Sequence, residues 1–355
     1  RRLRRISNTP QGGAITGNAA DGALMVDQGI IQGERVVMKI TVIGAAGSVG
    51  APASFYLAAL GLTDEIVMIG GQRQNIVKQH SMDISSAASS MGVKVTCGSY
   101  EDMAGSDIII NTVAGNQGLI KDRMDLLPVN IGLIMDIAEQ IKIHCPGSLV
   151  ITVTVPVDPL NYATYKITGF DRNQIIGYSL NDTIRFREML AEHFQSQPGQ
   201  VEGIVIGEHG NTQVMLFSTA KLDGRPVIIG EEAKKSIRAE VPRILKRFEE
   251  LKSGRTSGWT CAVGLAQIVR AIARDTGEII PCSVMLRGEY GLQGLSMGVP
   301  VVLGKGGVKE IVEYELAPDE QEGLRITAET LRNAQKKTDE YLTARSMSDK
   351  IRHAP

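Results

Sequence analysis

Three glycines, each three residues from the next, follow a short apolar run in the segment KITVIGAAGSVG, residues 39–50. Gly44 would allow a tight turn after a strand, Gly47 would let backbone N–H groups approach phosphate oxygens, and Gly50 would let the next helix pack closely. An amphipathic segment at 51–60 and a second apolar run at 65–69 follow. This strand–helix–strand order predicts that the turn binds the pyrophosphate of a dinucleotide.

A second set of residues could move a proton and bind an organic acid. His209 lies in a Gly-Glu-His-Gly segment just after an apolar run, where it could act as a general acid or base. Asp182 and Arg185 are three residues apart on a predicted helix, so they share a face, and a guanidinium can bind a carboxylate through two parallel hydrogen bonds. Together such groups could transfer a proton on a substrate that carries a carboxylate. A structural histidine, an acid at a helix N-terminus and a surface arginine are the alternative interpretations.

Strand-like and helix-like segments alternate from Met38 onward. The apolar runs are rich in valine and isoleucine and are apolar throughout, which is typical of strands buried on both faces of a parallel sheet. We therefore expect an α/β fold with a doubly wound parallel (Rossmann) sheet, its strands at 40–43, 66–69, 93–96, 108–113 and 149–155.

The second half of the chain has a different pattern. Long amphipathic segments alternate with paired apolar runs, and Asp223-Gly224 is typical of a hairpin turn. We expect a mixed α+β substrate domain here, with helices at 182–194, 231–251, 259–275 and 319–342 and strands at 201–206, 213–218 and 282–286.

The ends of the chain differ from its middle in composition and periodicity. Residues 1–37 begin with arginines and continue as a mixture of Gly, Ala, Asn and Gln with little periodicity, which predicts a flexible extension. Met38 stands directly before the first predicted strand, and we expect the natural chain to start there. The dinucleotide-binding domain is predicted at 38–180, the catalytic domain at 181–345 and a tail at 346–355.

Bulk composition narrows the class of partner. The 355 residues are 43% hydrophobic and carry a net charge of −1, so the chain suits about two domains and has no basic excess for nucleic acid. No apolar run approaches the roughly 20 residues of a membrane span. The four cysteines have neither C-x-x-C nor zinc-ligand spacing. We expect free thiols in a cytoplasmic protein, no metal site and a small-molecule partner.

Several motifs occur in a consistent order along residues 38–342: KITVIGAAGSVG, RMDL at 123–126, PVDP at 156–159, NDTIRF at 181–186 and IGEHGN at 206–211. Together they resemble the lactate and malate dehydrogenase family, and most of all its archaeal malate/lactate group. The glycine spacing is the malate-type form, whereas GEHG is the lactate-type or archaeal malate-type form. The resemblance implies an NAD(P)-dependent L-2-hydroxy acid dehydrogenase that is a homodimer or homotetramer.

The resemblance also implies roles for individual residues. His209 matches the proton-relay histidine, Asp182 the aspartate that orients it, and Arg185 the arginine that binds the substrate carboxylate. Arg123 matches the arginine of a mobile loop that closes over the substrate. Cofactor-binding residues are expected at Gly44, Gly47, Ser48, Val49, Gly50, Gly70, Gly71, Gln72, Arg73, Val113, Ala114, Gly115, Asn130 and Val153.

One departure from the family concerns the cofactor. At the end of the second strand most NAD-specific members have an acidic residue, which accepts hydrogen bonds from the adenosine ribose. This chain has Gly70 there, and Arg73 follows three residues later. Because no carboxylate repels a 2′-phosphate and Arg73 could bind it, we expect NADP to be preferred, with NAD as the alternative.

Two further departures concern the substrate. Val155 replaces an asparagine that holds the reacting oxygen in the family, and the loop before Arg123 is one residue shorter than usual. Counted back from Arg123, Gln117 stands where malate-type members carry an arginine for the second carboxylate. We expect a monocarboxylic 2-oxo acid to be slightly favoured. An NADP-preferring malate dehydrogenase, in which Lys121 serves the second carboxylate, is one alternative. A non-catalytic dinucleotide-binding homologue, supported by Val155, is another.

Overall fold

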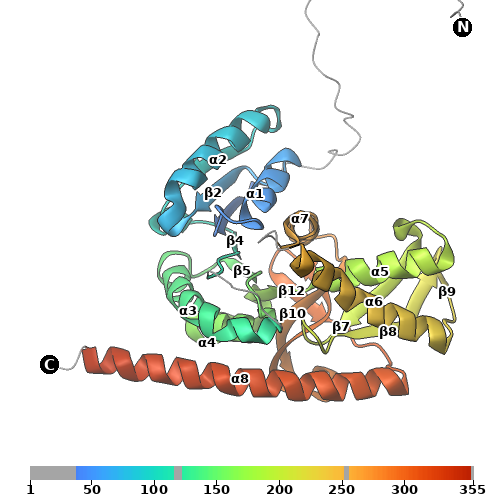
Figure 1. Ribbon diagram of the computed structural model, residues 1–355. Coiled ribbons are helices and arrows are strands. Elements are labelled where there is room, and N and C mark those ends of the chain that lie inside the picture. The colour runs from blue at the N-terminus through green and yellow to red at the C-terminus, as the bar shows by residue number, and fades with distance from the viewer. Residues whose placement is uncertain (1–36, 116–121, 252–255, 353–355) are drawn as a thin grey trace, which may run out of the picture. The chain divides into compact units, whose positions relative to one another are not determined.

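The computed structural model describes residues 37–115, 122–251 and 256–352 (Figure 1). Six parallel strands form the first part of the main sheet: β1 (Lys39–Ile43), β2 (Glu65–Ile69), β3 (Lys94–Cys97), β4 (Ile108–Asn111), β5 (Leu149–Thr152) and β6 (Ile175–Tyr178). They pair in the order β3-β2-β1-β4-β5-β6. The chain thus builds the sheet outward in both directions from β1, so the predicted doubly wound parallel sheet is confirmed.

Alternate residues of these strands face two different hydrophobic cores. Ile40 and Val42 of β1 pack in a core with α1 (Gly50–Ala59), α2 (Gln74–Ala87) and α7 (Gly258–Ala273). Ile43 of the same strand packs in a second core with α3 (Leu127–His144). Residues of β2, β4 and β5 alternate between the two cores in the same way. Both faces of the sheet are therefore covered, which explains why these strands read as unbroken apolar runs.

The second half of the chain extends this sheet and adds a smaller one. The long strands β10 (Ile279–Arg287), β11 (Gln293–Gly304) and β12 (Gly307–Ile311) are antiparallel and join the parallel strands through the pairing of β10 with β6. A separate antiparallel sheet contains β7 (Val201–Ile206), β8 (Val214–Leu222) and β9 (Arg225–Pro226). Asp223 and Gly224 connect β8 to β9 with φ of 48° and 75°, which confirms the predicted hairpin turn.

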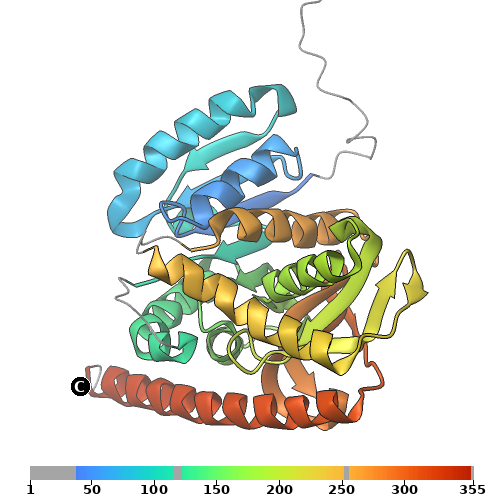
Figure 2. The ribbon, with the colours of Figure 1, turned by 45° about the vertical axis from the view of Figure 1, so that its right-hand side comes forward.

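The remaining helices are α4 (Val157–Thr168), α5 (Leu180–Phe194), α6 (Glu231–Glu250) and α8 (Pro318–Arg352). Helix α5 packs on β7 and α6. Helix α8 contacts α3 and α4 as well as β8 and β11, and two views show it running along these elements (Figure 1 and Figure 2). It therefore connects both halves of the chain.

Several boundaries differ from the predictions. The fourth and fifth strands end at Asn111 and Thr152, two and three residues before their predicted ends. The chain turns there because side chains bond to the backbone: the Asn111 carbonyl side chain accepts from Val113 N–H, and Thr154 Oγ1 donates to the Val113 carbonyl. Helix α8 reaches Arg352, so the predicted tail begins inside a helix. The sequence patterns did not predict α4, β6, β11 or β12. The predicted extension, apart from Val37, lies outside the described residues.

Candidate active site

The predicted cofactor residues follow the ends of neighbouring parallel strands. Ile43 pairs in register with Ile69 and with Asn111, and Asn111 pairs with Thr152. The predicted cofactor segments therefore all begin at the carboxyl edge of the sheet. They are the glycine turn, the Gly70 turn, the Val113–Gly115 segment and Val153. Ligands of doubly wound sheets bind at this edge, where the strand order reverses.

The glycine turn leaves room for a phosphate. Gly44 has φ of 84°, and a Cβ atom there would lie 2.8 Å from Thr112 Oγ1. A Cβ atom on Gly50 would lie 2.6 Å from the Gly44 carbonyl oxygen, so only glycine permits this closeness of turn and helix. Ser48 and Val49 lead into α1, which has no side-chain N-cap and no acid in its first turn. Within the helix, Ala51 and Ala53 N–H already donate to the Gly47 and Val49 carbonyl oxygens and Pro52 has no N–H, so the backbone of Ser48 to Gly50 at the helix start fits the pyrophosphate of a dinucleotide.

Asn130 holds together the two loops that follow β4 and β5. Its Oδ1 accepts from Gly115 N–H at 2.8 Å, and its Nδ2 donates to the Val155 carbonyl oxygen at 2.7 Å. The side chain is fully buried. Asn130 therefore shapes the predicted nicotinamide end of the site through backbone groups, and Val155 takes part through its carbonyl.

The turn after β2 is organised by a side chain that the sequence analysis missed. Gln74 accepts from Gly70 N–H at 3.0 Å through Oε1 and donates to the Gly98 carbonyl oxygen at 2.6 Å through Nε2. It thus ties the end of β2 to the end of β3. Gly71, Gln72 and Arg73 form the short helix η2 (Gly71–Arg73) and are exposed. A Cβ atom on Gly70 would collide with the buried Val77.

His209 and Asp182 form a buried pair. His209 Nδ1 is 2.5 Å from Asp182 Oδ2, and the two residues are 6% and 3% exposed. Burial lowers the pKa of His209, and the nearby Arg123 and Arg185 lower it further against the attraction of Asp182. Burial alone would raise the pKa of Asp182, but His209 and the two arginines keep it below its usual value. The ionised carboxylate can therefore fix the imidazole tautomer and stabilise the imidazolium.

Two guanidinium groups lie beside this pair. Arg185, one turn further along α5, places Nη1 3.7 Å from Asp182 Oδ1, and its Nη2 donates to Ser257 Oγ at 2.8 Å. Arg123 opens the short helix η5 (Arg123–Leu126), and its Nη1 donates to the backbone carbonyl of His209 at 3.0 Å. The structure thus brings the four predicted residues His209, Asp182, Arg185 and Arg123 together. Ser257, just before α7, is an addition that no sequence motif indicated.

The backbone of the histidine loop is bonded to two further helices. His209 N–H donates to Asp158 Oδ2 in the first turn of α4 at 2.8 Å. Glu208 N–H donates to Thr327 Oγ1 of α8 at 2.8 Å. Glu208 itself is buried and accepts from the Thr212 N–H and hydroxyl. The PVDP motif includes Asp158, but the sequence did not show which group the Asp158 carboxylate would contact.

The remaining predictions concern the substrate loop, the cysteines, metal ions and the membrane. Gln117 and Lys121 lie outside the described residues. The four cysteines are free thiols, three of them buried. Within the described ranges no group of three or more His, Cys, Asp or Glu side chains could hold a metal ion. No helix in those ranges is both long enough and apolar enough to cross a membrane.

The chain is similar to known proteins along most of its length. Two family descriptions match the chain: lactate/malate dehydrogenase, NAD binding domain, over residues 38–177, and lactate/malate dehydrogenase, alpha/beta C-terminal domain, over residues 180–342. The malate dehydrogenase of Haloarcula marismortui is 36% identical over 296 residues, which are 82% of this chain and 97% of the relative. L-lactate dehydrogenase 1 of Clostridium acetobutylicum is 33% identical over 305 residues, 83% and 97% of the two chains.

Solved structures are similar along nearly their whole length. The lactate dehydrogenase of Cryptosporidium parvum, complexed with lactic acid and β-nicotinamide adenine dinucleotide, superposes with a TM-score of 0.80 at 28% identity, covering 85% of this chain and 98% of that one. The malate dehydrogenase of the same organism has a TM-score of 0.81 at 26% identity, covering 86% and 99%. Proteins named for lactate and for malate are therefore about equally similar to this chain.

Proposed function

This chain belongs to the lactate/malate dehydrogenase family, and we propose that it catalyses reversible hydride transfer between a nicotinamide cofactor and a small 2-hydroxy acid. The observation that carries this proposal is the buried pair of His209 Nδ1 and Asp182 Oδ2, with Arg123 and Arg185 beside it. A protein that only bound dinucleotides would have no physical need for a buried base, its orienting acid and two guanidinium groups in one place.

Each of these side chains has a distinct task in the proposed reaction. Bound dinucleotide supplies the hydride acceptor for oxidation and the donor for reduction. His209 takes the hydroxyl proton on Nε2 during oxidation and returns it to the carbonyl oxygen during reduction. Asp182 holds Nδ1–H and stabilises the imidazolium that forms. Because burial keeps the pKa of His209 low, the neutral base is available for oxidation at neutral pH.

The two arginines bind the substrate at different points. Arg185 is held by Asp182 and Ser257, so its guanidinium is oriented before a substrate carboxylate arrives. Arg123 donates to the His209 carbonyl oxygen in the described structure. In the proposed mechanism it exchanges this bond for the substrate's reacting oxygen, where its charge stabilises the developing alkoxide.

We propose NADP as the preferred cofactor. Two features support this choice: the absence of an acid at Gly70, and the exposed Arg73 in the same turn. Gln74 uses its amide oxygen on Gly70 N–H, so this side chain does not supply the missing ribose acceptor. The family description names NAD, which remains the alternative.

We propose a monocarboxylic 2-oxo acid as the substrate, in preference to oxaloacetate. The argument depends on Gln117, a neutral residue at the predicted malate-specific position. A second carboxylate in a closed site would cost several kcal/mol if it stayed unpaired. Arg123 and Arg185, the two guanidinium groups beside His209, also support this choice. Each already has its own proposed task, so neither is left to bind a second carboxylate.

One set of assays tests these proposals together. Initial rates are measured with pyruvate, 2-oxoisocaproate and oxaloacetate, each with NADPH and with NADH, by following nicotinamide absorbance. We expect turnover with at least one 2-oxo acid, a higher kcat/KM with NADPH, and pyruvate or 2-oxoisocaproate ahead of oxaloacetate. A tenfold preference for oxaloacetate would make the enzyme a malate dehydrogenase. No turnover with any pair, despite cofactor binding, would favour the non-catalytic homologue.

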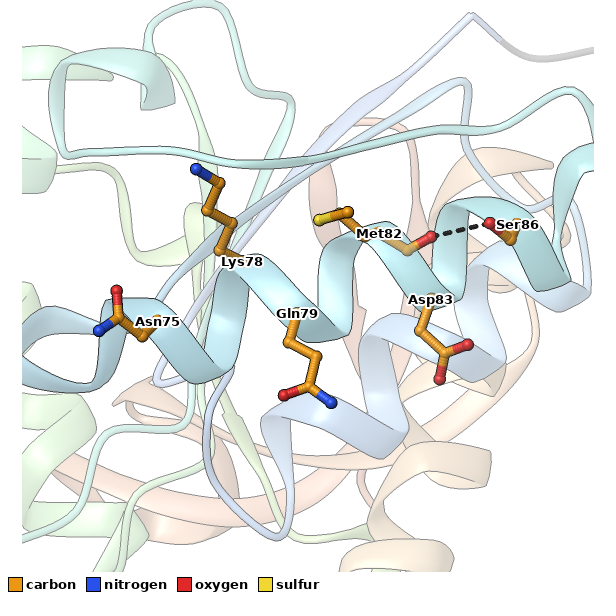
Figure 3. A pocket seen from close by; sticks show the side chains of 6 residues that line it. All are labelled: Asn75, Lys78, Gln79, Met82, Asp83 and Ser86. Atoms are coloured by element: carbon orange, nitrogen blue, oxygen red, sulfur yellow. Dashed lines mark hydrogen bonds between the residues drawn. The ribbon is translucent and has the colours of Figure 1, made fainter.

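We also propose that the chain assembles with copies of itself. One face of α2 lines a shallow surface cavity with Asn75, Lys78, Gln79, Met82, Asp83 and Ser86 (Figure 3). Met82 is 66% exposed, and Trp259 of α7 is 75% exposed. Lys78 and Asp83 give this face one positive and one negative charge, which a two-fold-related copy of the same face can pair. Analytical ultracentrifugation of wild type and Met82→Lys tests this, and a monomeric wild type would contradict it.

A further inference from the structure

Asp158 is a buried carboxylate without a role in the proposed reaction so far. It lies in the first turn of α4 and is 1% exposed. Its Oδ2 accepts from the backbone N–H of His209 at 2.8 Å, and its Oδ1 accepts from Ser283 Oγ at 2.6 Å. His209 is thus held by two carboxylates from two helices: Asp182 bonds to its ring and Asp158 bonds to its backbone.

We propose that Asp158 is a positioning residue for the dehydrogenase reaction: it anchors the backbone of His209 so that the ring meets Asp182, and its negative charge favours the protonated imidazole. This inference rests on the proposed function, because only a proton-transferring His209 needs such control. The anchoring has a structural reason. The loop after β7 contains Gly207 and Gly210, so its course depends on bonds to other elements: Gly207 pairs with Gly298 of β11, and the residues after it bond to Asp158, Thr327 and Arg123.

The charges around His209 come from four elements. Asp182 and Arg185 face it from α5, Arg123 from η5, Asp158 from α4, and Glu208 is its neighbour in the loop. Burial raises the pKa of Asp158 to about 7, against the hydrogen bonds from Ser283 and His209, and the charges of Glu208 and Asp182 raise it further. Burial likewise raises the pKa of Glu208. Because Asp158 bonds directly to the His209 backbone, its charge and the protonation of the imidazole are coupled.

Neighbouring hydroxyl groups can hydrogen-bond to Asp158 in both of its protonation states. Ser283 Oγ lies 3.0 Å from Ser296 Oγ, and Asn161 Nδ2 donates to Ser296 Oγ at 3.1 Å. When Asp158 is ionised, Ser283 donates to it, as in the described geometry. When Asp158 is protonated, it can donate to Ser283, whose own proton then turns toward Ser296. The carboxyl can thus gain or lose a proton without leaving its hydrogen-bonding position.

The key variant is Asp158→Asn, which keeps the size of the side chain and an acceptor for His209 N–H but removes the charge. Without this charge the imidazolium loses a stabilising neighbour, so the pKa of His209 should fall by about one unit. The acid limb of kcat/KM for 2-hydroxy acid oxidation, where His209 must be neutral, should move to lower pH by the same amount. We expect kcat to fall about tenfold. Asp158→Glu should restore the pH limb toward that of the wild type.

A second measurement does not depend on turnover. The protein is labelled with ¹³C at histidine Cε1, saturated with NADPH and titrated by NMR, and the His209 signal is assigned with His209→Gln. Thr164→Val serves as the control, because the hydroxyl of this buried threonine of the same helix donates to the Leu160 carbonyl oxygen and does not touch His209 or Asp158. We expect an unchanged His209 pKa in the control and a lowered one in Asp158→Asn.

The outcomes separate this inference from the proposed function. A wild type that turns over no 2-oxo acid would contradict the proposed function, while the NMR titration would still test Asp158. An active wild type whose kcat, pH limb and His209 pKa are the same in Asp158→Asn would overturn the inference. If Asp158→Asn does not fold, Ser283→Ala decides. Loss of that hydroxyl removes one bond to the carboxylate and makes its ionised form less stable, so the pH limb should move in the same direction by a smaller amount, and no movement would overturn the inference.

Discussion

The two ends of the site are built in opposite ways. At the catalytic end, His209, Asp182, Arg185 and Asp158 are each less than 7% exposed and bonded to one another or to neighbours from other elements. At the proposed adenosine end, Gly71, Gln72 and Arg73 are exposed in one short turn. The Gln74 side chain ties this turn to the end of the next strand.

The difference indicates where substitutions should matter most. Buried charges interact strongly and must keep their partners, because an unpaired charge has no water to solvate it. Exposed charges are screened by solvent and salt, so each contributes little. Catalytic substitutions should therefore change rates by orders of magnitude. Substitutions in the Gly70–Arg73 turn should change selectivity between cofactors by smaller factors and leave the chemistry intact.

The largest effect is expected from His209→Ala. Loss of the general acid and base should lower kcat by about 10²- to 10⁴-fold. Cofactor binding, measured by NADPH fluorescence, should remain. His193→Ala is the matched control, since His193 is exposed in the last turn of α5, at the opposite end of this helix from Asp182. Near-normal turnover in His209→Ala would remove this residue from the mechanism.

A smaller but still large effect is expected from Arg185→Lys. The charge is kept, but a single ammonium cannot make two parallel hydrogen bonds to a carboxylate. It also cannot hold both Asp182 and Ser257 in the same way. We expect kcat/KM for the 2-oxo acid to fall about 100-fold, mostly through KM. An unchanged KM would mean that another group binds the carboxylate.

At the adenosine end, an added acid should reverse the cofactor preference. Gly70→Asp alone would force its Cβ into Val77, so the informative variant is Gly70→Asp with Val77→Ala. The new carboxylate should accept from the ribose hydroxyls and repel a 2′-phosphate, changing the NADH/NADPH ratio of kcat/KM by about 10- to 100-fold. Val77→Ala alone is the control for the packing change. A wild type that already prefers NADH would contradict the proposed NADP preference.

The smallest effect is expected from Arg73→Ala. This exposed guanidinium should add only a screened attraction for a 2′-phosphate, so kcat/KM with NADPH should fall about tenfold at low salt and less at high salt. The value with NADH should stay the same. An equal loss with both cofactors would show that Arg73 supports the turn and not the phosphate, which would weaken the contrast between the two ends.

Local sequence patterns were sufficient for much of this molecule. Unbroken valine- and isoleucine-rich runs predict strands that are buried on both faces, and the glycine spacing predicts the turn before α1, because both follow from the backbone and side chains of consecutive residues. The i, i+3 spacing places Asp182 and Arg185 on one helix face for the same reason. Motifs that resemble a family identified His209 and Arg123 as well.

Tertiary structure alone decided which of these residues meet. His209 follows β7, Asp182 follows β6 and Asp158 follows β5, and nothing in their spacing shows that α4 points its first turn at the His209 backbone. The bond of Arg185 to Ser257 spans 72 positions, and that of Arg123 to His209 spans 86. The strands β10, β11 and β12 join the parallel sheet through the pairing of β10 with β6. Such contacts depend on strand register and helix packing. Both result from many weak interactions between residues that are distant in sequence, so they cannot be predicted from local patterns.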